Sequence, residues 1–160
     1  MEKIVIVIIE DQREVLEAIA KDLAPLEDAF MIEECDSADE AGELMENLDS
    51  EGDYVALIIS DHIMPGKTGV DFLIEMNEDP RFEATKKILL TGLATHQDTI
   101  NAINNAAIDR YIEKPWNAAN LMNYVKELIT EFILKKGIDY TPYVQHLDQT
   151  VLFNKLKNNP

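Results

Sequence analysis

Short apolar runs rich in isoleucine and valine recur along this chain and alternate with longer segments whose apolar residues follow the helical period. The first run, residues 4–9, reads IVIVII and is apolar at every position, as a strand covered on both faces must be. Strands that alternate with helical segments are typical of βαβ units and of a parallel sheet. This alternation restricts the possible folds more than any other feature of the sequence.

The predicted elements follow one another in strict alternation, five strands and five helices before residue 137. The expected strands are residues 4–9, 31–35, 54–60, 87–90 and 110–113. The expected helices are residues 14–23, a segment from a Ser37–Glu40 capping box to residue 48, then 69–77, 97–105 and 118–135. Short connections and right-handed crossovers leave few topologies for this order. We therefore predict an α/β fold with a doubly wound, five-stranded parallel sheet of the flavodoxin-like kind.

Polar side chains stand where four of the five predicted strands end. Glu10 and Asp11 follow the first strand, Asp61 the third, Thr91 the fourth and Lys114 the fifth. The carboxyl ends of parallel strands share one edge of the sheet, so we expect these side chains to converge there. Taken singly, each has a plainer interpretation, such as a helix cap for Asp11 or a solvated charge for Lys114. Their joint occurrence on one predicted edge favours a functional site.

Carboxylates grouped in this way are typical ligands of a hard divalent cation. Mg²⁺ prefers a few carboxylate oxygens together with water and phosphate, so Asp11 and Asp61, with Glu10 through a water, form a suitable set. The backbone carbonyl of Ile63 is a further expected ligand. A carboxylate attacks phosphorus only when the phosphoryl oxygens are neutralised, and Lys114 supplies a cation for that purpose. Asp61 is the expected nucleophile because it stands at the centre of the set.

The same residues carry a resemblance to a known family. The matching segments are the pair Glu10–Asp11, the string DHIMPGKTG from Asp61, LTG with Thr91, and YIEKPW with Tyr111 and Lys114. Each segment is weak evidence alone, but the four in this order are highly specific. Over about residues 3–134 the chain resembles the receiver domain of two-component response regulators.

The resemblance implies a signalling role rather than an enzyme, with catalysis limited to the domain's own phosphorylation and dephosphorylation. Asp61 is then the acceptor of a phosphoryl group from a sensor histidine kinase or phosphotransfer protein, with Mg²⁺ bound, and Lys114 bonds a phosphoryl oxygen. Thr91 is expected to move toward the phosphoryl group and to let Tyr111 turn inward. This change repacks the face formed by the fourth helix, the fifth strand and the fifth helix. A cis peptide bond is expected before Pro115.

Neighbouring positions add two expectations about the lifetime and access of the phosphoryl group. Ile63 and Leu93 flank the path of an attacking water in this family, and neither apolar side chain can orient that water. We therefore predict slow autodephosphorylation. Gly92 has no side chain, so it leaves the site open to a large phosphodonor.

Two other protein classes share part of this pattern. Haloacid-dehalogenase-like phosphatases also use an aspartate nucleophile and magnesium, but they place a second acid two residues later, where this chain has Ile63. Flavodoxin-like electron carriers need a phosphate-binding loop after the first strand, whereas the acids at Glu10 and Asp11 would repel a flavin phosphate. The phosphatase is the alternative that we retain.

Composition and charge exclude several further functions. The chain has 160 residues, with 14 basic and 31 acidic side chains and a net charge of −17, which repels nucleic acids and anionic lipids. No apolar run approaches the roughly 20 residues of a membrane helix. We therefore expect a cytoplasmic protein that contacts neither a membrane nor nucleic acid directly.

The remaining reactive side chains receive plainer interpretations. His62, His96 and His146 have no metal-ligand spacing, and we expect surface or loop positions for them. The single cysteine, Cys35, is expected to be a half-buried thiol on the second strand.

The resemblance stops near residue 137, so we divide the chain into a receiver domain, residues 1–136, and a C-terminal helical extension or linker, residues 137–160. The Thr141–Pro142 pair predicts a helix start, and an apolar stripe follows it. The segment from residue 135 onward has four lysines and two aspartates, a net charge opposite in sign to that of the rest of the chain. Three arrangements stay open for the extension: docking on its own domain, a homodimer contact, or the start of an effector module, and we rank the last two about equally.

Overall fold

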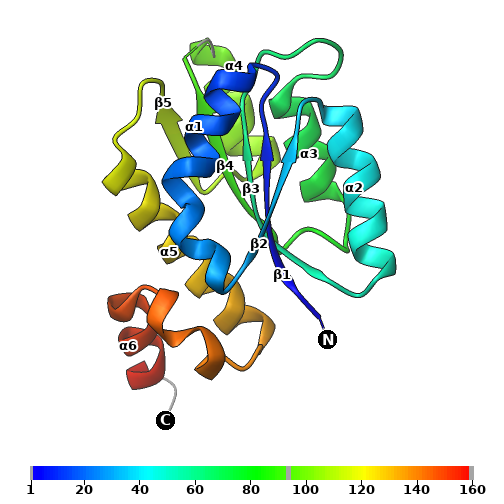
Figure 1. The fold of residues 1–160 in the computed structure, drawn as a ribbon. Helices are drawn as coiled ribbons and strands as arrows, with labels where there is room; N and C mark the ends of the chain where they lie inside the picture. The colour runs from blue at the N-terminus through cyan, green and yellow to red at the C-terminus, as the bar shows by residue number, and fades with distance from the viewer. Residues whose placement is uncertain (1, 93–94, 159–160) are drawn as a thin grey trace.

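Five parallel strands form one sheet in the order β2-β1-β3-β4-β5, with helices on both faces (Figure 1). This computed structural model describes residues 2–92 and 95–158. The strands are β1 Ile4–Ile9, β2 Met31–Cys35, β3 Tyr54–Ser60, β4 Lys86–Thr91 and β5 Arg110–Glu113. The predicted fold class and all five predicted strands are therefore confirmed.

The helices follow the predicted alternation as far as residue 136. They are α1 Arg13–Leu23, the 3-10 segment η1 Ala24–Asp28, α2 Ala38–Ser50, α3 Gly69–Glu78, α4 His96–Asn101, the π-helical segment η2 Ala102–Ala106, α5 Ala118–Lys136, the 3-10 segment η3 Thr141–His146 and α6 Gln149–Asn158. Across residues 2–92 and 95–158, we find no helix with the length and apolar character needed to cross a bilayer.

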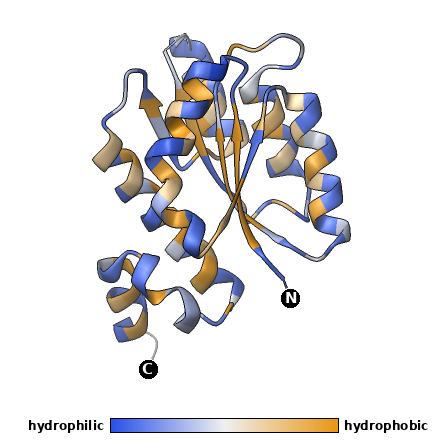
Figure 2. Ribbon diagram, in the orientation of Figure 1, coloured by the Kyte–Doolittle hydropathy of each residue, from blue (hydrophilic) through white to orange (hydrophobic). Residues whose placement is uncertain are grey.

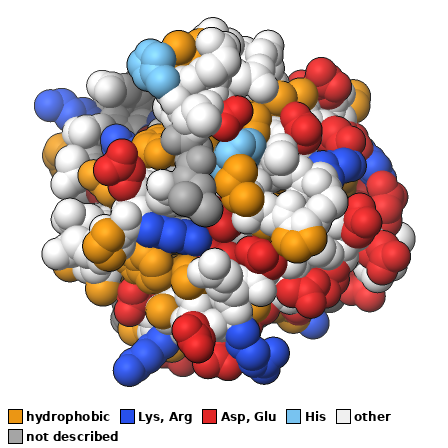
Figure 3. Space-filling view, turned by 90° about the horizontal axis from the view of Figure 1, so that it is seen from above, with side chains coloured by type: hydrophobic (Ala, Val, Ile, Leu, Met, Phe, Trp, Pro, Cys, Tyr) orange, Lys and Arg blue, Asp and Glu red, His pale blue; other side chains and the backbone are white. Residues whose placement is uncertain are grey.

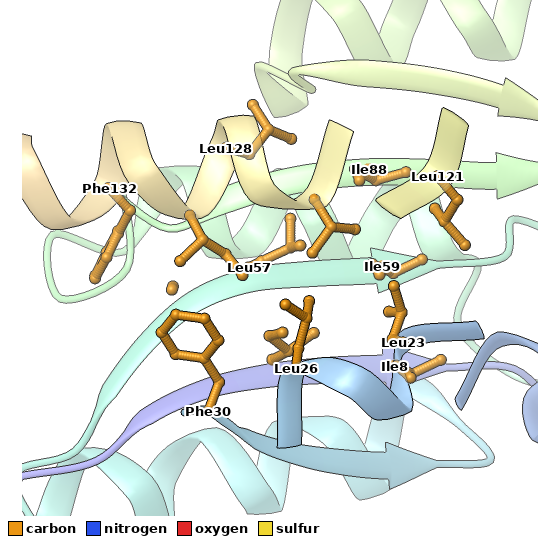
Figure 4. Packing of buried hydrophobic residues seen from close by; sticks show 14 of the residues in the cluster. Ile8, Leu23, Leu26, Phe30, Leu57, Ile59, Ile88, Leu121, Leu128 and Phe132 are labelled. Carbon is orange, nitrogen blue, oxygen red and sulfur yellow. The ribbon is translucent and has the colours of Figure 1, made fainter. Parts of the chain in front are cut away.

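The sheet separates two apolar cores. On one face, α1 and α5 pack over alternate residues of the central strands, such as Ile8 and Leu57 (Figure 4). On the other face, α2 and α3 pack over the intervening residues, such as Val7 and Ile58. β1 is apolar along its whole length, and β3 is apolar over most of it (Figure 2), as expected for strands whose side chains are buried on both faces of the sheet.

Local capping signals fix where several helices begin. Oγ of Ser37 accepts a hydrogen bond from the Glu40 amide at 3.1 Å, which is one of the two bonds of the predicted capping box. The start of α1 differs from the expectation that Asp11 caps it. Its N-cap residue is Gln12, and the Gln12 amide donates to Oε2 of Glu10 at 3.1 Å.

The helix expected over residues 97–105 consists of two parts with different geometry. The α-helical part ends at Asn101, and the π-helical segment η2 continues to Ala106, after which Ala107 has a left-handed backbone with φ of 53°. Ala102 and Ala106 are both buried, and Nδ2 of Asn77 in α3 donates to the backbone oxygen of Asn105 at 3.2 Å. The π-helical segment η2 packs against α3, and the period of the apolar residues alone does not predict this change of helix geometry.

The C-terminal extension packs on the receiver domain, one of the three arrangements that the sequence left open (Figure 1). The Tyr143 ring stacks on Phe30, with centroids 5.5 Å apart, and Leu147 and Leu152 are buried. The Asp148 amide donates to Oγ1 of Thr130 in α5 at 2.8 Å. The short extension thus obtains its stability from contacts with α5 and with Phe30.

The extension is not the single helix that its apolar stripe predicts. Leu147 has an extended backbone, with φ of −96° and ψ of 161°, and separates η3 from α6. The carboxylate of Asp148 then accepts from the Val151 amide at 3.0 Å and starts α6. The break turns the side chain of Leu147 into the core instead of along a straight helix face.

Candidate functional site

The main-chain ladder brings Glu10 and Asp61 to adjacent strand ends. Beyond the last residues of β1 and β3, the Asp61 amide donates to the backbone oxygen of Ile9 at 3.0 Å, and the Glu10 amide donates to that of Cys35 at 3.0 Å. Both residues therefore continue the sheet by one position. Their side chains lie at the carboxyl edge of the sheet because the strands are parallel.

Three carboxylates gather at this edge. One oxygen from each of Glu10, Asp11 and Asp61 lies within 4.8 Å of the other two. Glu10 and Asp61 are 1% and 6% exposed, whereas Asp11 is open to solvent. Three hard oxygen donors, with one side open to water, fit the coordination preference of Mg²⁺. The predicted convergence of these residues is confirmed.

Lys114 completes the predicted set from the end of β5. Its Nζ lies 2.5 Å from Oε1 of Glu10 and 3.4 Å from Oδ2 of Asp61. The peptide bond between Lys114 and Pro115 is cis, as expected. A single ammonium thus faces two buried carboxylates, which leaves the group with a net negative charge.

Burial controls the electrostatics of Glu10. Removal from water raises the pKa of its carboxyl group above the ordinary value, and the nearby charge of Asp61 adds to this effect. Hydrogen bonds from Lys114 and from the Gln12 amide act in the opposite direction. A bound cation would favour the ionised form of this carboxyl group.

The two residues expected to act as a switch lie on neighbouring strands. Thr91 is fully buried at the end of β4, and Tyr111 is half-buried on β5, paired in register with Leu89. Tyr111 packs on the edge of the core that contains α3 and η2. Their switching roles stay predictions.

Positions around the site bear on access to it. Gly92 is exposed, and Ile63 is an exposed apolar side chain, 45% accessible, two residues beyond Asp61. Its backbone carbonyl stays a predicted ligand. Leu93, the other residue behind the predicted slow dephosphorylation, lies outside the described residues. Viewed from this edge, acidic side chains gather over the α2 and α3 side of the molecule (Figure 3).

Gly69 lies beside the site, and the sequence did not single it out. A Cβ at this residue would overlap the backbone oxygen of Asp61 and lie 2.7 Å from Oγ of Ser60. The Gly69 amide donates to the backbone oxygen of His62 at 2.8 Å. The start of α3 is therefore pressed against the peptide of Asp61, and only glycine fits. The signal in the sequence was the Thr68–Gly69 pair, a cap followed by a residue without a side chain.

His62 lies in the loop between β3 and α3, within the predicted surface or loop positions, but its side chain is buried instead of exposed. The side chain is 5% exposed, and Nδ1 accepts a hydrogen bond from the Val70 amide at 3.4 Å. Nε2 lies 3.1 Å from Oδ2 of Asp98 in α4. The fold buries this imidazole between α3 and α4, two helices that are far apart in sequence. No local pattern around His62 signals this position.

Comparison with known proteins agrees with the fold. Residues 6–126 match the family model described as the response regulator receiver domain. The hydrogenase transcriptional regulatory protein HoxA of Cupriavidus necator is 31% identical over 124 residues, which are 78% of this chain and 24% of HoxA. Response regulator Rre1 of Synechocystis sp. is 31% identical over 99 residues, 59% of this chain and 42% of that protein.

Solved structures show the same architecture. A CheY-like receiver domain protein from Methanospirillum hungatei JF-1 has a TM-score of 0.71 at 25% identity, covering 84% of this chain and 99% of that one. The signal receiver domain of an HD domain-containing protein from Pseudomonas fluorescens Pf-5 has a TM-score of 0.74 at 23% identity, covering 86% and 94%.

The chain spans less than half the length of these two curated relatives. The family model covers most of the sheet and all of the residues at its carboxyl edge. The haloacid-dehalogenase alternative is not favoured by these matches. The chain belongs to the response regulator receiver domain family, a family of signalling domains.

Proposed function

We propose that this domain accepts a phosphoryl group on Asp61 from a phosphohistidine of a sensor histidine kinase or phosphotransfer protein. The observation that carries the proposal is the group of side chains around Asp61. This carboxylate is 6% exposed, it lies within 4.8 Å of oxygens of Glu10 and Asp11, and Lys114 is 3.4 Å away.

In the transfer, one carboxylate oxygen of Asp61 forms a bond to phosphorus while the P–N bond of the phosphohistidine breaks. The electron pair of that bond returns to the imidazole nitrogen of the donor. Lys114 pairs with a phosphoryl oxygen, and the His62 amide, 2.8 Å from Oδ1, orients the carboxylate. Asp11, Asp61 and the Ile63 carbonyl, with Glu10 through a water, would hold a Mg²⁺ ion, which would supply positive charge against the phosphoryl oxygens.

The output is a change on the face of α4, β5 and α5, transmitted by Thr91 and Tyr111. Support comes from the position of Thr91 at the end of the strand beside Asp61 and from the partial burial of Tyr111. Ile100 and Ile103 have exposed side chains, so part of the surface of this face is apolar. The module that responds to the changed face is an effector module, which belongs either to this protein or to a partner protein. HoxA is named a transcriptional regulator and is about four times longer than the matched part.

Self-association through residues 137–160 is a separate proposal. The inner side of α6 already packs on α5, so a homodimer would depend on its outer side, where Phe153 is 65% exposed and Leu156 is 44% exposed. The molecular mass in solution of the full chain and of the Phe153→Ser variant tests this point. A monomeric full chain would exclude it.

Phosphorylation is tested by incubation with Mg²⁺ and acetyl phosphate, followed by intact mass analysis. The wild type is expected to gain one phosphoryl group, and Asp61→Asn none. Asp71→Asn, which changes an exposed acid in the first turn of α3, is the matched control and should be modified like the wild type. Equal modification of wild type and Asp61→Asn would contradict the proposal, and loss of the group within seconds would contradict slow dephosphorylation.

A further inference from the structure

The buried imidazole of His62 joins the loop after Asp61 to two helices. Its ring accepts from the Val70 amide at the start of α3 and lies 3.1 Å from Oδ2 of Asp98 in α4. Its own amide donates to Oδ1 of Asp61 at 2.8 Å. One residue therefore contacts the carboxylate at the centre of the site through its main chain and α4 through its side chain.

The hydrogen-bond pattern defines the tautomer of this ring. Because Nδ1 accepts from a backbone amide, it carries no proton, so the proton of the neutral imidazole lies on Nε2. Nε2–H then donates to the carboxylate of Asp98, which is a charge-assisted hydrogen bond. The contact thus exists without any change in the charge of His62.

The first turn of α4 has few other contacts that hold it in place. None of the residues His96–Asn101 is buried, whereas η2 is anchored by Ala102 and Ala106. Asp98 forms a capping box with Thr95, in which Oδ2 accepts from the Thr95 amide at 3.2 Å. The oxygen that closes the capping box is also the oxygen that His62 contacts.

We propose that His62 is a positioning residue that holds the N-terminus of α4 against the Asp61 loop and transmits phosphorylation of Asp61 to α4. The second half of this proposal, the transmission of phosphorylation to α4, rests on the proposed function. In the acyl phosphate, the carboxylate oxygen that accepts from the His62 amide loses its share of the negative charge, and that hydrogen bond weakens. Residue 62 then shifts, and its ring shifts relative to Asp98. This route is separate from Thr91 and Tyr111 because it enters α4 from the loop between β3 and α3.

The unphosphorylated protein tests the first half by amide hydrogen exchange. In His62→Leu, the amides of the first turn of α4, such as Thr99, should exchange about tenfold faster, the change expected from losing one hydrogen bond to a charged group. In His62→Gln, the side-chain amide restores a donor near the position of Nε2, and exchange should stay within about twofold of wild type. Exchange in α5 is the internal control and should not change.

Two further measurements separate this role from simple loss of stability. ¹⁵N spectra of the His62 ring should show the Nε2–H tautomer in wild type, and Asp98→Ala should shift the Nε2 signal while leaving Nδ1 bonded. Thr95→Val removes the hydroxyl that caps α4 without touching His62, so it should speed exchange in α4 and leave the ring signals unchanged. Unchanged α4 exchange in His62→Leu, or the Nδ1–H tautomer in wild type, would overturn the proposal.

The second half is tested after treatment with Mg²⁺ and acetyl phosphate. Phosphorylation should alter exchange in the first turn of α4 in wild type and in His62→Gln, and the alteration should fall by at least half in His62→Leu. An identical response in His62→Leu would refute transmission through His62. A wild type that gains no phosphoryl mass refutes the proposed function instead, and the comparison of unphosphorylated variants still decides the positioning role.

Discussion

Nζ of Lys114 lies 2.5 Å from Oε1 of Glu10, a carboxylate that is almost completely buried. The two residues are 104 positions apart in the chain and meet because β1 and β5 end at the same edge of the sheet. This ion pair offsets part of the cost of burying Glu10, and the raised pKa of Glu10 indicates that the offset is incomplete. A divalent cation bound beside Glu10 would offset the remaining cost of burying its carboxylate.

Magnesium should therefore stabilise the protein. At a concentration one hundred times the Kd, binding contributes about 2.7 kcal/mol, which for a chain of this size raises Tm by roughly 5–10 °C. Asp11→Asn should remove most of this rise, because Asp11 is the solvent-facing member of the carboxylate group. Glu14→Gln, an exposed acid in the next helix, is the control. Thermal unfolding with and without MgCl₂ measures the effect, and an equal rise in Asp11→Asn would contradict the assignment.

The magnesium effect should depend on pH in a defined direction. Burial raises the pKa of Glu10 above its unfolded value, so this group favours the folded state below the unfolded pKa, and the contribution is lost as pH rises through the folded pKa. Magnesium binds the ionised form, so the Tm increase should grow as pH rises through the same interval and level off above it. Titration of ΔTm against pH checks the sign. A ΔTm that grows toward low pH would be inconsistent with it.

Gly69→Ala should disrupt the site. The new Cβ would overlap the backbone oxygen of Asp61, and because the obstacle is backbone it cannot rotate away. We expect a loss of about 1–3 kcal/mol in the free energy of unfolding and slower phosphorylation by acetyl phosphate. Gly42→Ala, in α2 with no atom within 4 Å of the new Cβ, should instead stabilise by about 0.5–1 kcal/mol. Urea unfolding of both variants provides the comparison, and equal stabilities would show that the close approach is absent.

The C-terminal extension should contribute to the stability of the receiver domain. Leu147→Ala removes a side chain that is buried in the α1 and α5 core and should cost about 2–4 kcal/mol. Thr130→Val removes the acceptor of the Asp148 amide and should cost about 1 kcal/mol. Phe153→Ser, on the outer side of α6, should change the free energy of unfolding by less than about 0.5 kcal/mol. Unaltered stability in Leu147→Ala would show that the extension is detached in solution.

Cys35 should be unreactive in the folded protein. Burial, with the nearby acids as a second cause, raises the pKa of its thiol to about 12, so almost no thiolate is present at neutral pH. Alkylation by iodoacetamide at pH 8 should proceed only as fast as the protein unfolds, and it should accelerate in urea. Fast alkylation of the native protein, followed by mass, would place the thiol at the surface.

The sequence by itself determined the layers of the fold and the composition of the site. Runs such as Ile4–Ile9 have no polar face, so they form strands covered on both sides, and residues that follow parallel strands must share an edge. Glu10, Asp61 and Lys114 were therefore predictable as neighbours. These inferences need only local patterns and one rule of topology.

The tertiary structure alone decided the burial of His62, the close approach of Gly69 to Asp61 and the docking of residues 137–158. Each of these depends on contacts between segments that are distant in sequence, such as His62 with Asp98 or Tyr143 with Phe30. The types of side chain in a segment and their period indicate which secondary structure that segment can form. Which surface it meets is set by the packing of the whole domain, because burial and hydrogen bonding are properties of both partners.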